Sequence, residues 1–130
     1  VPVLELDDGT RLTEGPAIVQ YLADRVPERG LAPPAGTMAR YRLQEWLNFI
    51  STELHKGFSP LFVAATPEEA KAQFRAKLHE RLEWVDGQLE GRPFLLGDAF
   101  TVADAYLFVV TGWGGYVGVD IAPYRQIAAY

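Results

Sequence analysis

The sequence of 130 residues contains no cysteine. A disulfide framework, a thiolate metal site and a cysteine nucleophile are therefore excluded within these residues. The same absence is typical of proteins that work in a reducing compartment, and we expect a cytoplasmic protein. Two histidines are present, at dissimilar positions along the chain. Because no cluster of metal-ligating residues can be read from the spacing, we expect no metal site.

The sequence also lacks a dense basic run and a long apolar run. Its formal charge is -5 at pH 7, from 12 Lys and Arg against 17 Asp and Glu. Nucleic acids and anionic membranes attract clustered basic side chains, so we expect neither as a partner. No apolar stretch approaches the length that crosses a bilayer, and we expect no secretory leader. A chain of this length that is 48% hydrophobic is expected to form a core of its own.

The two ends of the chain do not resemble those of a gene product. The sequence opens without Met at "VPVLEL", which is typical of a strand, and closes at the amphipathic segment "YRQIAAY". Our hypothesis is that both ends are truncated. Mass spectrometry of the expressed protein would refute it by finding these termini to be native.

The first 29 residues predict a β-hairpin followed by a helix. An Asp-Gly pair at residues 8 and 9 separates two short apolar runs, and Gly tolerates the positive φ that a tight turn needs. From Pro16 the apolar residues follow helical spacing. The Pro- and Gly-rich stretch "VPERGLAPPAG" then ends the helix, and we place a linker at residues 30–36.

Residues 37–130 predict an all-helical domain, so the fold class of the whole chain is α+β. Two apolar stripes predict two long antiparallel helices. Thr101 and Asp104 have the spacing of a capping box, with Asp in place of the usual Glu or Gln, which assigns Asp104 a structural role. The helix that follows is apolar nearly all round, and we expect it at the buried centre of the bundle.

Two polar groups are candidates for a site. Glu14 and Gly15 stand at a helix start, whose N–H groups bind a carboxylate while the acid attracts a cation, so the pair suits an amino acid zwitterion. The simpler alternative is a capping or solvated Glu. His55 and Lys56 in "ELHKGF" either form a basic helix end or hydrogen-bond a thiolate or anion. His79 has no comparable neighbourhood and is interpreted as a surface residue.

A third candidate group is aromatic. Aromatic side chains at helical spacing belong more often to a core than to a pocket, so both interpretations stay open. No Ser-His-Asp arrangement and no glycine-rich phosphate loop is readable. The aromatic candidates for an apolar pocket are Phe58, Phe62, Tyr106, Trp113 and Tyr116.

Several stretches together resemble the bacterial beta class of glutathione transferases. They are the hairpin after Val1-Pro2, then "LTEGPAIVQYLAD", "WLNFISTELHKGF" and "FLLGDAFTVADAYLF". The resemblance implies that residues 1–29 end a thioredoxin-like domain and that residues 37–130 form an all-α C-terminal domain, within a homodimer. It also implies that the first helix of that fold, which carries the Cys, Ser or Tyr facing the glutathione sulfur, lies outside these residues, as do the last helices.

The resemblance implies glutathione-binding roles for three residues near the N-terminus. Val1 pairs through its backbone with the cysteinyl part of glutathione, in front of what resembles the family's cis-proline, Pro2. Glu14 holds the γ-glutamyl amino group, and the N–H of Gly15 holds the γ-glutamyl carboxylate. Many relatives have Ser or Thr at the position of Gly15, so a hydroxyl contact is missing here.

The resemblance assigns further roles to the helical domain. Asn48 and Glu53 resemble residues that reach across the dimer to the neighbour's γ-glutamyl group. His55 resembles the catalytic hydrogen-bond donor to the glutathione sulfur, and Lys56 a residue near the glycyl end. The candidates for the wall of the electrophile pocket are Phe58 and Trp113.

The activity that the resemblance implies is conjugation of the glutathione thiol to small hydrophobic electrophiles, in detoxification, with peroxide reduction as a further activity. Glutathione is then a co-substrate, and no cofactor is expected. Two alternatives stay open. One is a non-catalytic module for interaction or dimerisation, and the other is a disulfide reductase, which needs a Cys outside these residues. We expect this fragment alone to be inactive.

Overall fold

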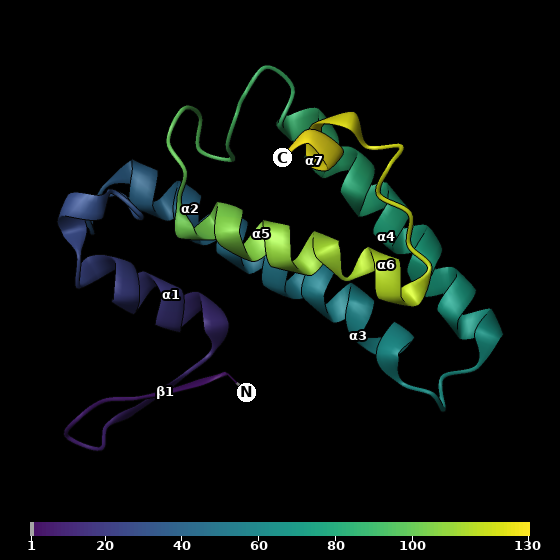
Figure 1. Cartoon of the computed structure of the whole chain (residues 1–130), viewed down its shortest axis with the longest axis horizontal. Coiled ribbons are helices and arrows are strands. Elements are labelled where there is room, and N and C mark those ends of the chain that lie inside the picture. Colours follow the sequence, from purple (N-terminus) through teal and green to yellow (C-terminus); the bar gives the residue numbers. More distant parts are fainter. Residues whose placement is uncertain (1) are drawn as a thin grey trace.

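A computed structural model describes residues 2–130 and begins with an antiparallel hairpin (Figure 1). Its strands are β1 (Val3–Glu5) and β2 (Arg11–Thr13), and Leu4 pairs with Leu12. Gly9 in the connecting turn has φ 82°, a conformation that glycine adopts without steric cost. The predicted hairpin is therefore confirmed.

Helix α1 (Gly15–Asp24) and a 3-10 turn, η1 (Pro27–Arg29), lead from the hairpin to the helical part. Arg40 joins the two parts. Its guanidinium donates to both carboxylate oxygens of Asp24, and its Nε donates to the carbonyl of Pro33 at 2.7 Å. This hydrogen bonding holds the pKa of Asp24 below its usual value. Because Arg40 is 5% exposed, this ion pair is partly shielded from water.

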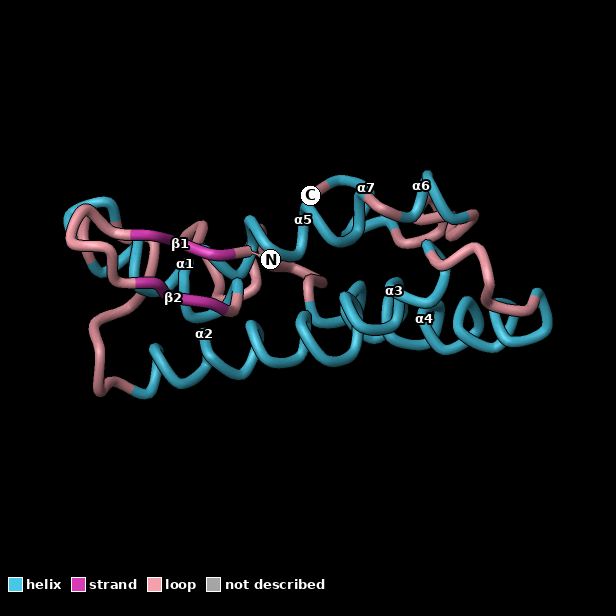
Figure 2. Tube along the Cα trace, turned by 90° about the horizontal axis from the view of Figure 1, so that it is seen from below, coloured by secondary structure: helices cyan, strands magenta, loops and turns pink. Residues whose placement is uncertain are grey.

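The helical part opens with one continuous helical segment followed by an antiparallel partner (Figure 2). The segment consists of α2 (Met38–Phe49), a π-helical stretch η2 (Ile50–His55) and α3 (Lys56–Phe62). The partner is α4 (Glu68–Gln88), and α3 and η2 both contact it. The two predicted long antiparallel helices are confirmed, but the sequence spacing did not predict the π-helical stretch.

The last helices are α5 (Val102–Gly112), α6 (Gly114–Val117) and α7 (Arg125–Ala129). The predicted capping box is present at the start of α5. The expectation that α5 is buried all round is wrong for one face, since Phe108 and Val109 are 65% and 54% exposed. Within residues 2–130, no element covers these two side chains enough to bury them.

A second correction concerns His79 on α4, which is half-buried rather than a surface residue. Its Nδ1 lies 2.6 Å from the hydroxyl of Tyr124, just before α7. Asp86 on the same helix accepts hydrogen bonds from the N–H groups of Gln126 and Ile127. These contacts hold α7 against α4, and the sequence spacing gave no sign of them.

One hydrophobic core lies between η2, α3, α4 and α5. Fully buried side chains from these elements and their neighbours include Leu43, Leu47, Ile50, Leu54, Phe58, Leu78, Leu82, Val85, Leu107 and Val110.

None of the helices in the described part of the chain combines the length and apolarity needed to span a membrane.

Candidate functional site

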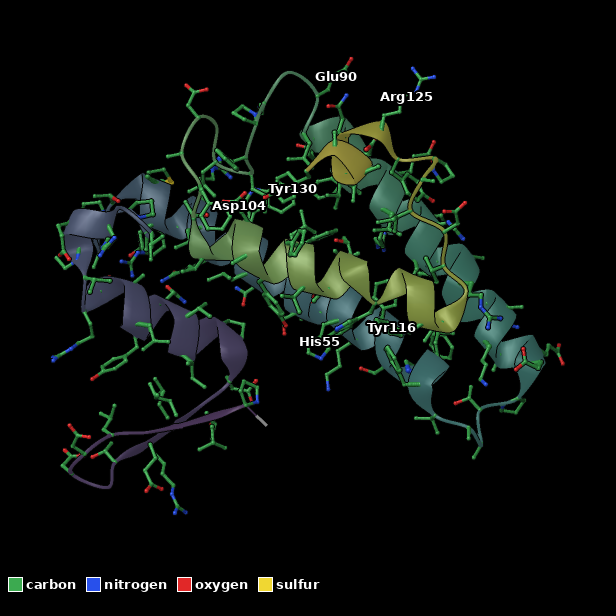
Figure 3. All side chains as sticks on the ribbon, in the orientation of Figure 1. His55, Glu90, Asp104, Tyr116, Arg125 and Tyr130 are labelled. Atoms are coloured by element: carbon green, nitrogen blue, oxygen red, sulfur yellow. The ribbon has the colours of Figure 1, made fainter. Side chains whose placement is uncertain are left out.

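A cleft of about 470 Å³ lies where the start of α1 approaches the bundle. Figure 3 shows His55 below α5, on the long helical segment. The cleft joins residues that are far apart in the sequence, from α1, η2, α3 and α5, from the segment before β1 and from the residue before α1. They are Pro2, then Glu14, Gly15, Pro16 and Val19, then Ser51, His55 and Lys56, and finally Val102, Ala105, Tyr106 and Val109.

Glu14 has an unusual backbone conformation, with φ 68° and ψ 113°. Among residues 2–130 it is the sole non-glycine residue with positive φ, a state that costs about 1–3 kcal/mol and is common at ligand sites. Its exposed side chain makes no capping hydrogen bond to α1. The alternative in which Glu14 caps the helix is therefore excluded.

Gly15 is the first residue of α1, and its N–H is one of the donors that a helix leaves without an intrahelical partner. The N–H groups of Ala17 and Ile18 both donate to the carbonyl of Glu14, at 3.0 Å. A Cβ atom at Gly15 would have the Cγ of Pro2, 3.8 Å away, as its nearest neighbour. The helix start is thus open toward the cleft and has room for a side chain.

His55 ends the π-helical stretch η2 on the opposite wall of the cleft. Its Nδ1 lies 2.8 Å from the hydroxyl of Tyr106, and the ring of Trp113 packs edge-on at a centroid distance of 4.7 Å. Burial, and then the positive charge of Lys56, lower the pKa of His55 below 6.5. The imidazole is therefore mainly neutral at pH 7.

Ser51 is a cleft residue that no sequence pattern singled out, whereas Tyr106 is one of the aromatic pocket candidates and lines this cleft. Burial raises the pKa of Tyr106, the neighbouring Ser51 side chain opposes this shift, and the negative charge of Glu14 adds to it. Ser51 stands four residues before His55, a spacing that shares a helix face and would have identified it. Tyr106 comes from α5, and no local signal links it to η2.

The structure brings together four of the sequence-predicted site residues: Glu14, Gly15, His55 and Lys56. Val1 lies outside the described residues. Asn48 is exposed on α2 and does not line the cleft. Glu53 forms an ion pair with Arg81 on α4, with 2.8 Å between Oε2 and Nε. In the described part of the chain, no three acidic or histidine side chains gather as a metal site.

The two candidates for the electrophile pocket lie apart from this cleft. Phe58 has no exposed surface and packs beneath Trp113, with ring centroids 6.1 Å apart. This burial corrects the expectation that Phe58 lines a pocket, because a side chain without exposed surface cannot contact a ligand. Trp113 lines a neighbouring groove of about 400 Å³, which Val109 connects to the cleft. Phe62 and Tyr116 are exposed.

Comparison with known proteins places the chain among glutathione S-transferases. Residues 68–130 match the family described as "Glutathione S-transferase, C-terminal domain". "Glutathione S-transferase GstA" of Escherichia coli O157:H7 is 52% identical over all of this chain, which covers 65% of that protein. "Glutathione S-transferase GST-4.5" of Xanthomonas campestris is 37% identical, again over all of this chain, which covers 67% of that protein. The chain therefore spans about two thirds of the length of these curated relatives.

Solved structures agree with this assignment. The ternary complex of BphK, a bacterial GST, matches 99% of this chain with a TM-score of 0.97 and 58% identity, and the match covers 64% of that chain. A sphingomonad glutathione S-transferase complexed with glutathione matches all of this chain with a TM-score of 0.95 and 49% identity, and the match covers 65% of that chain. The bacterial beta class glutathione S-transferase of Sphingomonas chungbukensis matches all of this chain with a TM-score of 0.96 and 44% identity, and the match covers 65% of that chain. The chain belongs to the glutathione S-transferase family.

Proposed function

We propose that the protein is a glutathione transferase that conjugates the glutathione thiol to small hydrophobic electrophiles. The observation that carries this proposal is the strained, exposed Glu14 at an open helix start, in one cleft with His55 and Lys56. The sphingomonad structure that matches all of this chain is a complex with glutathione. In this proposal residues 1–29 belong to the glutathione-binding domain, residues 30–36 are the linker and residues 37–130 form the helical domain.

The γ-glutamyl end of glutathione carries one ammonium and one carboxylate. The Glu14 carboxylate accepts hydrogen bonds from the ammonium, and the N–H of Gly15 donates to the carboxylate. Both groups stand at the start of α1, so the zwitterion is held at two points of opposite charge. Val1 is proposed to pair with the cysteinyl backbone, as the family resemblance implies.

His55 is proposed to donate a hydrogen bond to the glutathione sulfur. A donor that favours the thiolate lowers the thiol pKa, and the positive charge of Lys56 acts in the same direction. The thiolate then attacks the electrophilic carbon, so that a C–S bond forms while the leaving group departs with its bonding electrons. Holding both reactants in adjoining cavities supplies part of the rate. Val109 and Trp113 are proposed as the apolar wall beside the electrophile.

We further propose that the protein forms a homodimer through a face of α2 and α4. Trp46, Phe49 and Trp84 form an aromatic cluster there, with ring centroids 4.7 to 5.9 Å apart, beside a groove of about 660 Å³. Trp84 is 46% exposed, which is unfavourable for a large aromatic ring in water. Glu53 lies one helical turn from Phe49, so it is placed beside this face, where Asn48 and Glu53 are proposed to reach the partner's γ-glutamyl group.

We expect His55→Ala to lower kcat for conjugation at least about tenfold, because a charge-assisted hydrogen bond to the thiolate is lost. The KM for glutathione should change little, since Glu14 and Gly15 remain. Steady-state rates of the intact protein with a small activated aryl halide measure both constants, and circular dichroism reports whether the variant is folded.

The matched control for this variant is His79→Ala, which removes the other histidine and should leave turnover unchanged. Unchanged turnover in His55→Ala would remove His55 from the site. An intact parent protein that neither turns over the aryl halide nor binds immobilised glutathione would overturn the proposed activity and favour the non-catalytic module.

Gly15→Ser is expected to lower the KM for glutathione about threefold to tenfold, because the added hydroxyl can donate to the γ-glutamyl carboxylate. The position has ordinary van der Waals space, and its φ lies outside the positive range, so serine fits without strain. Gly15→Ala adds the Cβ alone and is the control, with no gain expected. A lower KM for glutathione in both variants, or in neither, would contradict the proposed contact of the serine hydroxyl with the γ-glutamyl carboxylate.

A further inference from the structure

Two polar side chains of the cleft have no role in the activity proposed above. The hydroxyl of Tyr106 lies 2.8 Å from Nδ1 of His55, and the nearby Ser51 lowers the pKa of Tyr106. Both Tyr106 and Ser51 line the cleft with His55, from two different elements. Tyr106 and His55 therefore form a hydrogen-bonded pair, and Ser51 lies beside it in the cleft.

The direction of the hydrogen bond between Tyr106 and His55 follows from counting protons. A neutral imidazole carries one N–H, on either Nδ1 or Nε2. Burial raises the pKa of Tyr106, so its hydroxyl keeps a proton that needs an acceptor. In residues 2–130, Nδ1 of His55 is the side-chain atom that lies within hydrogen-bond distance of this hydroxyl. The Tyr106 proton is then directed to Nδ1 of His55.

We propose that Tyr106 is a positioning residue, which donates its hydroxyl proton to Nδ1 of His55 and thereby keeps the imidazole proton on Nε2. This inference rests on the proposed function of His55 as a donor to sulfur. The opposite tautomer would turn a lone pair toward the thiolate, which repels it. Among the side-chain hydrogen bonds of residues 2–130, none occupies Nε2, so this N–H is free for a substrate atom.

The surroundings of the ring support a fixed orientation. Trp113 packs edge-on against the imidazole with an interplanar angle of 85°, and the Tyr106 ring approaches at 70°. The charged groups near the Tyr106–His55 pair are Lys56, next to His55, and Glu14, whose charge acts on Tyr106. A ring held on two sides and bonded at Nδ1 presents Nε2 in one direction.

The test is Tyr106→Phe, which removes one oxygen and keeps the ring that packs against His55. Nitrogen-15 spectra of the histidines in the intact protein separate the two tautomers without any need for turnover. In the parent protein we expect the His55 signals of an unprotonated Nδ1 and a protonated Nε2. In Tyr106→Phe we expect a mixture of tautomers. His55→Gln identifies which signals belong to His55.

Tyr124→Phe is the matched control, because Tyr124 makes the same type of contact with Nδ1 of His79, 2.6 Å away. It should change the His79 signals and leave those of His55 and kcat unaltered. For Tyr106→Phe we expect kcat about fivefold to tenfold lower, with little change in the KM for glutathione.

Protonated Nδ1 in the parent protein would overturn the proposal. So would an unchanged His55 spectrum in Tyr106→Phe, even if the rate falls, because the loss would then be structural. If the tautomer shifts as expected but the parent protein has no transferase activity, the positioning of His55 holds and the proposed function fails.

Discussion

Replacing Glu14 by alanine is expected to raise the KM for glutathione about tenfold to a hundredfold, because a charge-assisted hydrogen bond to the γ-glutamyl ammonium is lost. Glu14 is exposed and makes no capping bond, so its removal leaves no unpaired partner within α1. The reacting thiol lies at another part of glutathione, so kcat should change far less. Initial rates at varied glutathione concentration measure both constants.

The control for loss of charge at the surface is Glu28→Ala, since Glu28 is exposed outside the cleft. Glu14→Gln keeps the side-chain length and one acceptor oxygen but removes the charge, so its KM should lie between those of the parent and Glu14→Ala. An unaltered KM in Glu14→Ala would contradict the assignment of Glu14 to the ammonium group.

Glu14→Gly separates binding from folding. Its φ of 68° suits glycine, so this variant should lose affinity like Glu14→Ala while gaining about 1 kcal/mol in the free energy of unfolding. Such a result would mean that this protein tolerates a destabilising backbone conformation at Glu14 for the sake of the carboxylate. Urea unfolding of the two variants side by side provides the comparison.

Asp104→Ala is expected to lower the free energy of unfolding by about 3–5 kcal/mol. The fully buried carboxylate accepts from the N–H and the hydroxyl of Thr101, at 2.6 and 2.7 Å. It also accepts from the N–H of Leu95 at 2.8 Å and from the hydroxyl of Tyr130. Alanine would leave these donors without a partner at the start of a helix that contributes to the core.

Asp104→Asn retains one acceptor oxygen and should lose less stability than Asp104→Ala. Asp120→Ala is the surface control, because Asp120 accepts one exposed hydrogen bond, from the N–H of Ala122, and its loss should cost about 1 kcal/mol or less. Equal losses in the free energy of unfolding for Asp104→Ala and Asp120→Ala would contradict the structural role of the capping box formed by Thr101 and Asp104. Urea unfolding followed by circular dichroism measures all three.

The elements with local signals were predictable from the sequence. The hairpin depends on an Asp-Gly turn, and the start of α5 on two residues three apart, so both are encoded within short segments. The pairing of Glu14 with a helix start was readable for the same reason. The strain at Glu14 was not, because a side-chain pattern carries no information on φ.

The contacts between elements were not predictable in this way. Helical spacing placed Phe58 and Trp113 on candidate faces, but it could not tell which face turns inward. The contact of Tyr106 with His55 joins positions 51 residues apart, and it depends on how α5 crosses the π-helical stretch. His79 was misjudged for the same reason, since its partner Tyr124 is distant in sequence.

The ion pair between Arg40 and Asp24 has a consequence for ligand affinity. Glu14 belongs to the hairpin part and His55 to the bundle, so a ligand that contacts both requires a fixed separation between two parts joined by a Pro-rich segment. Arg40 fixes that separation, since it is hydrogen-bonded to Asp24 and to the carbonyl of Pro33 at once. The cleft is therefore preorganised, and a ligand that bridges it does not lose affinity to the ordering of the two parts.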